Sequence, residues 1–192
     1  MRNMSLRENI LNTALERYAL HGIAATSVQD IADHAQSSKA NVLYHFTSKE
    51  QLVDSALSPA LEVLDAIVRG AETTGFDTRG PREAFVEGFI DFLLHHRLAV
   101  QIIVTHPYLA KSIPSLQSAH ELMGRMANLL AGSVPGHSEL SRFAIAISGA
   151  TYAVASSSLV GRDPLANSEF RSFLREALMS TLDLEPTLTA AP

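Results

Sequence analysis

Residues 22–52 have the sequence GIAATSVQDIADHAQSSKANVLYHFTSKEQL, and this stretch decides the fold of the N-terminal part. The helical spacing of its apolar residues predicts two short helices, at about residues 28–34 and 39–46. About four residues join them, and Ser48 is placed to cap a long helix that has Glu50 in its first turn. Two short helices joined by a tight turn, with a long helix behind them, predict a helix-turn-helix unit.

The segment before this unit also follows helical spacing, over residues 6–20. Gly22 is expected to end that helix, because glycine takes a positive φ without strain. Either Thr26 or Ser27 can cap the next helix, since each is followed three residues later by a residue that completes a capping box. The sequence leaves this choice open.

The helix predicted over residues 39–46 has a packed side and an exposed side at about 100° per residue. Lys39 falls nearer the packed side, although at the helix start its long stem can swing outward. Asparagine can bond adenine bidentately in the major groove, and Ser and Lys can bond bases or phosphates, so the exposed side suits DNA. We assign Val42, Leu43 and Phe46 to the packed side. The exposed side carries Asn41, Tyr44 and His45.

The charge pattern fits a few placed contacts with DNA. The chain has 15 basic and 20 acidic residues and a net charge of −5, which argues against a protein that coats nucleic acid by bulk charge. Residues 1–50 hold five of each sign, so the excess acid belongs to the rest of the chain. No Asp or Glu occurs from residue 34 to residue 49, a stretch that contains both Lys39 and Lys49.

Several short elements occur here together: SKANVLYHF at 38–46, SKE at 48–50 and, upstream, HG at 21–22, TSV at 26–28 and IA at 31–32. Together they resemble the TetR family of bacterial transcriptional repressors, over about the first 55 residues. The resemblance implies a homodimer whose helix-turn-helix domains bind a pseudo-palindromic operator in double-stranded DNA. It also implies that a small effector, bound in the C-terminal part, releases the DNA.

The resemblance further implies which side chains contact DNA. Tyr44 and Lys49 match positions that grip the DNA backbone, and Thr26 or Ser27 matches a phosphate contact. The competing interpretation of Tyr44 is burial against the long fourth helix. The predicted DNA-contacting residues are Thr26, Ser27, Gln36, Ser37, Ser38, Lys39, Asn41, Tyr44, His45 and Lys49.

Two residues depart from the family pattern. Gln36 replaces the glycine often found in the turn, and we expect it to need an unfavourable backbone conformation. Ser37 replaces a common apolar residue. Both polar replacements are expected to touch DNA, so the operator is expected to be distinctive.

The fold class predicted is all-α, with about nine helices. A three-helix DNA-binding domain over residues 1–47 precedes an effector-binding and dimerisation domain over residues 48–192. A glycine-rich break is expected over residues 70–81, after the fourth helix. Later helices are expected over residues 82–97, 99–106, 116–130, 138–159 and 167–182.

Aromatic and methionine side chains recur at helical spacing in the C-terminal part. Such stripes usually form a core, but in the family that the chain resembles these helices surround an effector cavity, and methionine and aromatic side chains suit an adaptable apolar pocket. We therefore predict a small lipophilic or aromatic effector. The candidate effector contacts are Phe89, Phe92, His96, His106, Tyr108, Met123, Met126 and Tyr152.

Small residues recur every four positions within residues 138–159, which lets helices approach closely. This packing can serve one chain or a dimer, and the resemblance favours a dimer built from the last two helices of each subunit. The candidate interface residues are Ser148, Gly149, Tyr152, Ala153, Ser156, Phe170, Phe173, Leu174, Ala177 and Leu178.

Composition and motifs argue against other classes. The absence of cysteine excludes disulfide scaffolds and thiolate chemistry. No signal peptide and no run of about 20 apolar residues is evident, so we expect a cytoplasmic protein without a membrane partner. No metal site is predicted, because the adjacent His95 and His96 point about 100° apart on a helix and no cysteine or paired carboxylates lie nearby. No cofactor is predicted, and no enzymatic activity, because the serines at 156–158 lack a nucleophile elbow. The alternative function is a helix-turn-helix regulator controlled by a protein partner instead of a small ligand.

Overall fold

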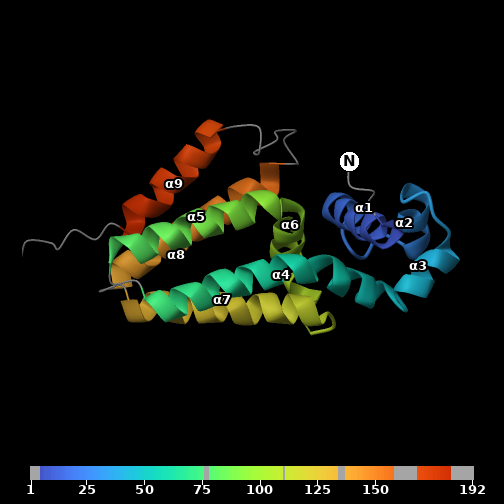
Figure 1. Ribbon diagram of the computed structural model, residues 1–192, viewed down its shortest axis with the longest axis horizontal. Helices are drawn as coiled ribbons and strands as arrows, with labels where there is room; N and C mark the ends of the chain where they lie inside the picture. Colours follow the sequence, from blue (N-terminus) through green and yellow to red (C-terminus); the bar gives the residue numbers. More distant parts are fainter. Residues whose placement is uncertain (1–4, 76–77, 110, 134–136, 158–167, 183–192) are drawn as a thin grey trace, which may run out of the picture. The chain divides into compact units, whose positions relative to one another are not determined.

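The computed structural model describes residues 5–75, 78–109, 111–133, 137–157 and 168–182, and within these ranges the chain is helical, without a strand (Figure 1). The predicted all-α class and the prediction of about nine helices are confirmed. The α-helices are α1 (Leu6–His21), α2 (Val28–His34), α3 (Lys39–His45), α4 (Lys49–Thr74), α5 (Arg79–His95), α6 (Arg97–Thr105), α7 (Pro114–Ser133), α8 (His137–Ser157) and α9 (Ser168–Leu182), and a short 3-10 helix, η1, spans Pro107–Leu109.

The described chain divides into two compact units. Unit 1 comprises residues 1–65 and 96–123, and unit 2 comprises residues 66–95 and 124–192. Unit 1 therefore contains α1, α2 and α3, which we call the head, together with the first part of α4, α6, η1 and the first part of α7. The functional boundary after residue 47 stays a prediction.

A serine caps the start of each of the first four helices. The cap satisfies a backbone N–H that has no partner within its own helix, and each cap contributes about 1 kcal/mol. At α2 the structure selects Ser27 over Thr26. The Oγ atoms of Ser5, Ser27, Ser38 and Ser48 accept hydrogen bonds from the backbone N–H groups of Glu8, Asp30, Asn41 and Gln51, at 3.2, 3.0, 3.1 and 3.1 Å.

The core of the head is formed by apolar residues that the helical spacing identifies. Val42 and Phe46 are buried as predicted, but Leu43 is 39% exposed, so its assignment to the packed side is wrong. A helix of seven residues has room for only one narrow buried stripe, which Val42 forms together with the C-cap residue Phe46. The other buried apolar residues of the head include Ile10, Ala14, Tyr18, Ile31 and Ala32.

The turn between α2 and α3 places a glutamine where helices usually have glycine. Gln36 has φ 52°, and it is the one non-glycine residue with positive φ in the described part of the chain, which confirms the strain expected there. The N–H of Gln36 donates to the carbonyl of Asp33, and the N–H of Ser37 donates to that of Ala32. These two bonds form a Schellman motif, whose left-handed position favours glycine.

The α6 helix is held to the end of α1 by two buried polar side chains. Nε2 of Gln101 donates to the Ala19 carbonyl at 2.8 Å, and the N–H of Ile23 donates to Nε2 of His106 at 3.4 Å. We call Gln101 and His106 the α6 latch. Because His106 Nε2 accepts a hydrogen bond, the ring proton of the neutral imidazole lies on Nδ1, which is 3.2 Å from the Ile102 carbonyl.

Gly22 makes the close approach of His106 to the head possible. It has φ 82° and ψ 156°, a conformation almost restricted to glycine, so the predicted positive φ is confirmed although ψ is extended and not left-handed. A Cβ at this position would lie 3.2 Å from His106 Nε2. Both the backbone angle and the nearby ring therefore require glycine.

The predicted break over residues 70–81 is wrong at both ends. The α4 helix continues through Gly70 to Thr74, and α5 already begins at Arg79. The break occurs at Gly75, which has φ 69°. Gly70 meets no other atom that would oppose a Cβ, so it is an ordinary exposed helix position and not a turn.

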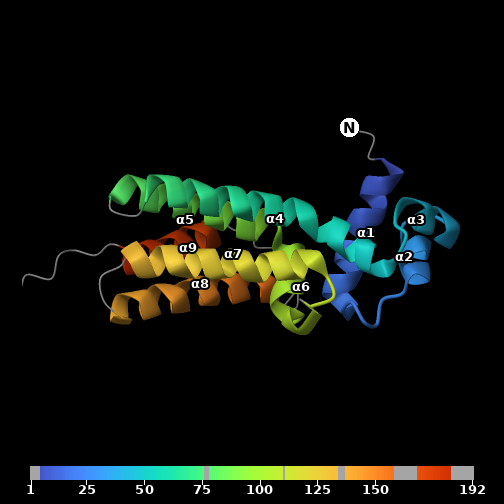
Figure 2. The same ribbon diagram turned by 90° about the horizontal axis from the view of Figure 1, so that it is seen from below.

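Unit 2 is built on α5, α8 and α9, which pack together (Figure 2). Phe85 stacks on Phe89 with ring centroids 5.8 Å apart, and Phe143 of α8 lies 6.4 Å from Phe85. On the surface, Arg171 bonds Glu87 and Asp91, which ties α9 to α5. Apolar packing supplies the stability of this unit, since exposed ion pairs contribute little.

Replacing Gln36 by glycine should stabilise unit 1, because glycine takes the φ of 52° without steric cost. We expect a gain of about 1 kcal/mol, or a rise in Tm of about 2–4 °C, in thermal unfolding followed by circular dichroism. Gln36→Ala is the control and should give no gain, because alanine keeps the Cβ. Equal stabilisation by both variants would contradict the strain explanation.

Gln101→Met should destabilise unit 1 by about 1 kcal/mol or more, because it keeps the side-chain volume but leaves the Ala19 carbonyl without its donor. The matched control is Gln117→Met, since Gln117 lies exposed on α7 and bonds Glu121 at the surface. Urea unfolding measures both. A Gln101→Met variant as stable as Gln117→Met would show that the latch has no structural importance.

Candidate nucleic-acid interface

The exposed side of α3 presents polar side chains from a firmly anchored helix. Tyr44 is 84% exposed, which excludes its burial against α4. Asn41 and Lys39 are also exposed, and His45 is half-buried with its ring 5.3 Å from that of Tyr44. Buried Val42 fixes the opposite side of the helix. The exposed side of α3 therefore offers hydrogen-bond donors and acceptors and carries no carboxylate.

Ser27 and Ser38 lie at the starts of α2 and α3 with exposed side chains. Each Oγ accepts a hydrogen bond from its own helix, which leaves the hydroxyl proton free for another acceptor. Gln36 is exposed in the turn between these helices. These three side chains extend the polar surface of α3 toward α2.

Thr26 and Ser37 do not belong to this surface. Thr26 is 1% exposed, and its hydroxyl lies 2.9 Å from the Gly22 carbonyl and 3.3 Å from the Arg17 carbonyl. The Ser37 hydroxyl oxygen is buried and has no hydrogen-bond partner in the described part of the chain. The prediction that both side chains face DNA is corrected by the structure: Thr26 closes the α1–α2 turn, and Ser37 lies inside the α2–α3 turn.

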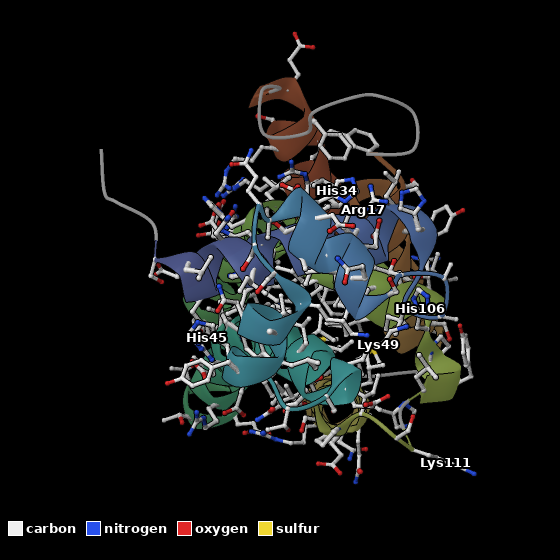
Figure 3. The ribbon with its side chains drawn as sticks, turned by 90° about the vertical axis from the view of Figure 1, so that its right-hand side faces the viewer. Arg17, His34, His45, Lys49, His106 and Lys111 are labelled. Carbon is white, nitrogen blue, oxygen red and sulfur yellow. The ribbon has the colours of Figure 1, made fainter. Side chains whose placement is uncertain are left out.

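Lys49 lies at the start of α4, half-buried, with Nζ 3.4 Å from the Ala24 carbonyl. Figure 3 shows Lys49 and His45 apart from each other on this face of the protein. The weak contact uses one of three ammonium donors. The remaining donors can reach an anion beside the loop that joins α1 and α2.

Two acids of the head, Asp30 and Glu8, accept hydrogen bonds from donors within the head. Arg17 donates to both carboxylate oxygens of Asp30, at 2.9 and 3.1 Å, and these bonds hold the pKa of Asp30 below its usual value. His34 lies on the other side of Asp30, at 3.5 Å, and Figure 3 shows Arg17 and His34 close together. The N–H and hydroxyl of Ser5 likewise lower the pKa of Glu8. The carboxylates of Asp30 and Glu8 therefore stay ionised near neutral pH and are held within the head.

The predicted effector contacts divide between the two units, and their common role stays a prediction. His96, His106, Tyr108 and Met123 belong to unit 1, whereas Phe89, Phe92, Met126 and Tyr152 belong to unit 2. Tyr108 and Tyr152 are largely exposed, and His106 serves the latch. In unit 2, Phe89 and Phe92 are buried in the aromatic cluster with Phe85 and Phe143. Phe143 is absent from the predicted set, because sequence spacing along one helix does not show which helix packs against it.

The predicted interface residues divide between surface and core. Ser148, Gly149, Tyr152 and Phe173 are exposed, and Ala153, Ser156, Phe170 and Ala177 are half-buried. Leu174 and Leu178 are 2% and 1% exposed, so they belong to the core of unit 2 and their assignment to an interface between chains is corrected. Ile145, which the sequence reasoning missed, is 71% exposed and precedes Ser148 and Tyr152 by three and seven residues. That helical spacing in the sequence is the signal that could have identified Ile145 as part of the same exposed stripe.

Other kinds of site find little support in the described ranges. No group of three His, Asp or Glu side chains there lies close enough together to hold a metal ion. No single helix in these ranges is long and apolar enough to cross a lipid bilayer, and α5 and α6 reach that measure only when counted together.

Residues 10–56 match a family model described as bacterial regulatory proteins, tetR family. The chain is 38% identical over 80 residues to the HTH-type transcriptional repressor KstR2 of Rhodococcus jostii, and 32% identical over 105 residues to the HTH-type transcriptional activator FasR of Mycolicibacterium smegmatis. These stretches cover 42% and 55% of this chain. They cover 39% and 48% of the relatives, so the chain spans less than half the length of each.

The fold as a whole is similar to a solved structure of the ketosteroid transcriptional regulator KstR2 of Mycobacterium tuberculosis. The TM-score is 0.70 at 21% sequence identity, and the superposition covers 95% of both chains. At that identity the likeness concerns the fold. The head is thus matched in sequence, and the remaining helices are matched in architecture.

Proposed function

This chain belongs to the TetR family of bacterial regulatory proteins, and we propose that it represses transcription as a homodimer that leaves its operator when a small apolar molecule binds. Its relatives regulate transcription, in agreement with the prediction that the chain is not an enzyme. The observation that carries the proposal is the exposed, acid-free polar side of α3. The relative KstR2, named a repressor, supports repression, although FasR is named an activator.

DNA binding would follow from the geometry of α3. The helix enters the major groove, where the amide of Asn41 can bond both N6 and N7 of adenine. Tyr44, Ser27, Ser38 and Lys49 add donors suited to phosphate oxygens. Phosphate contacts fix the register, and base contacts then specify the sequence.

A homodimer would present two copies of the polar side of α3 to DNA. The α8 helix exposes Ile145 and Tyr152 on one stripe with the small residues Ser148 and Gly149 between them, and α9 exposes Phe173. Exposed apolar side chains gathered in this way suit a protein interface, and small residues allow close helix approach. Two heads related by a two-fold axis would read half-sites about 34–36 Å apart for a spacing of one helical turn.

The effector would act in unit 2. The rings of Phe85, Phe89, Phe92 and Phe143 form an apolar cluster that suits a flat or lipophilic molecule. Because the related repressor is described as a ketosteroid regulator, steroid ketones are the first compounds to test. By linkage, an effector that weakens operator binding must itself bind less tightly to the DNA complex. The continuous helix α4 begins in unit 1 and ends in unit 2, so it is the proposed link between effector binding and DNA binding. The regulator would work in the cytoplasm.

Tyr44→Ala should weaken operator binding about tenfold per head, because it removes a donor to the DNA backbone. The measurement is a gel-shift titration with DNA from the region upstream of the protein's own gene, with size-exclusion chromatography to confirm an intact dimer. Tyr108→Ala is the matched control, since Tyr108 is an exposed tyrosine on η1. Equal affinity of the Tyr44→Ala variant and wild type would remove Tyr44 from the interface.

A thermal-shift screen of apolar compounds, steroid ketones included, should identify an effector. A ligand present at 100 times its Kd stabilises the folded state by about 2.7 kcal/mol. The same compound should release the protein from its operator in the gel shift. A protein that binds DNA but responds to none of the compounds would favour the alternative, a regulator controlled by a protein partner.

A further inference from the structure

Arg7 lies in the first turn of α1, yet its guanidinium reaches the C-terminal end of α3. The Cζ atom is 5.3 Å from the ring centroid of Phe46, which is the C-cap residue of α3. Phe46 itself is 1% exposed, whereas Arg7 is exposed. The guanidinium therefore covers the ring and faces solvent beside α3.

The guanidinium of Arg7 forms no ion pair within the described part of the protein. Arg17, the other described arginine of the head, donates two hydrogen bonds to Asp30, but Arg7 has no carboxylate within ion-pair distance among the described residues. The neighbouring carboxylate of Glu8 accepts from the N–H of Ser5 at 2.8 Å. Besides Ser5, Arg7 is close enough to Glu8 to help lower its pKa, but it forms no ion pair there, so the N–H donors of Arg7 stay available to another anion.

The contact with Phe46 leaves the hydrogen-bonding capacity of Arg7 intact. A guanidinium over an aromatic ring uses its face, whereas its five N–H donors lie at its edges. Planar, forked donors match the oxygens of a phosphate, and an arginine already held by stacking loses less rotamer freedom on binding. Phe46 therefore orders the side chain of Arg7 and leaves its N–H donors available to an anion.

A row of rings connects Arg7 to the exposed side of α3. The Tyr44 and His45 rings are 5.3 Å apart, and the His45 and Phe46 rings are 6.2 Å apart. Arg7 lies over the last ring of this row. It is thus at the same end of α3 as Tyr44, whereas Ser38 and Lys39 lie at the opposite end.

We propose that Arg7 binds a DNA phosphate bidentately beside the C-terminal end of α3, held in position by the ring of Phe46. This inference rests on the proposed DNA-binding function and adds a backbone contact from α1, which lies outside the helix-turn-helix. Bound at both ends of α3, the DNA backbone would fix the angle at which Asn41 meets the bases.

The test is the salt dependence of binding, measured by fluorescence anisotropy with a labelled duplex from upstream of the protein's own gene. For B-DNA the slope of log K against log salt is about −0.9 for each phosphate neutralised, and it reports phosphate contacts and not the folded fraction. Arg7→Met keeps an apolar stem over Phe46 but removes the charge. For a dimer we expect its slope to be shallower than that of wild type by about 1.8.

Lys111→Gln is the control, because it removes one exposed positive charge from a loop of the same unit, far from His45 in Figure 3. Its slope should equal that of wild type. An Arg7→Met slope equal to those of the control and wild type would overturn the proposal, whatever happens to affinity. Wild-type protein that bound neither this duplex nor any other would instead contradict the proposed function itself.

Discussion

The end of α1 is the constraint on which unit 1 depends. The last carbonyls of a helix have no partner within it, and here the chain must also turn through Gly22 toward α2. Gln101 and His106 of α6 bond the backbone on either side of that turn, at Ala19 and Ile23. Because these groups are buried, losing a partner costs more than an exposed hydrogen bond would. A segment more than 80 residues away in sequence is thereby made part of the same compact unit as the head.

This arrangement relates the fold to the proposed function. A DNA-binding surface needs its donors in fixed positions, and the seven-residue helix α3 is too short to be stable alone. Its position is set by buried Val42 and Phe46, by the serine cap and by the strained turn at Gln36. Each of these lies beneath or beside the exposed polar side. The rigidity of the exposed polar side of α3 therefore depends on the packing of the core beneath it. The α6 helix supports that core indirectly, because it is bonded to α1.

Much of the head could be predicted because its signals are local. The Ser48 cap and the packed positions Val42 and Phe46 depend on residues within one or two helical turns, whereas the strain at Gln36 was expected from the family that the chain resembles, which often has glycine there. The choice of Ser27 over Thr26 was not predictable, because both satisfy the same local rule. The buried hydroxyl of Thr26 reaches the carbonyls of Arg17 and Gly22, and that contact depends on how α1 meets the turn.

The sequence by itself determined the helical class, the helix-turn-helix and the polar side of α3, since short-range spacing, capping and backbone sterics carry that information. Only the tertiary structure decided that Ser37 lies inside the turn, that Leu174 and Leu178 belong to the core of unit 2, and that Ile145 is on the surface. Only it brought Arg7 onto Phe46 and His106 to Ile23. The physical reason is that burial and long-range polar contacts depend on which helices pack together, and helical periodicity in one segment carries no record of its partner.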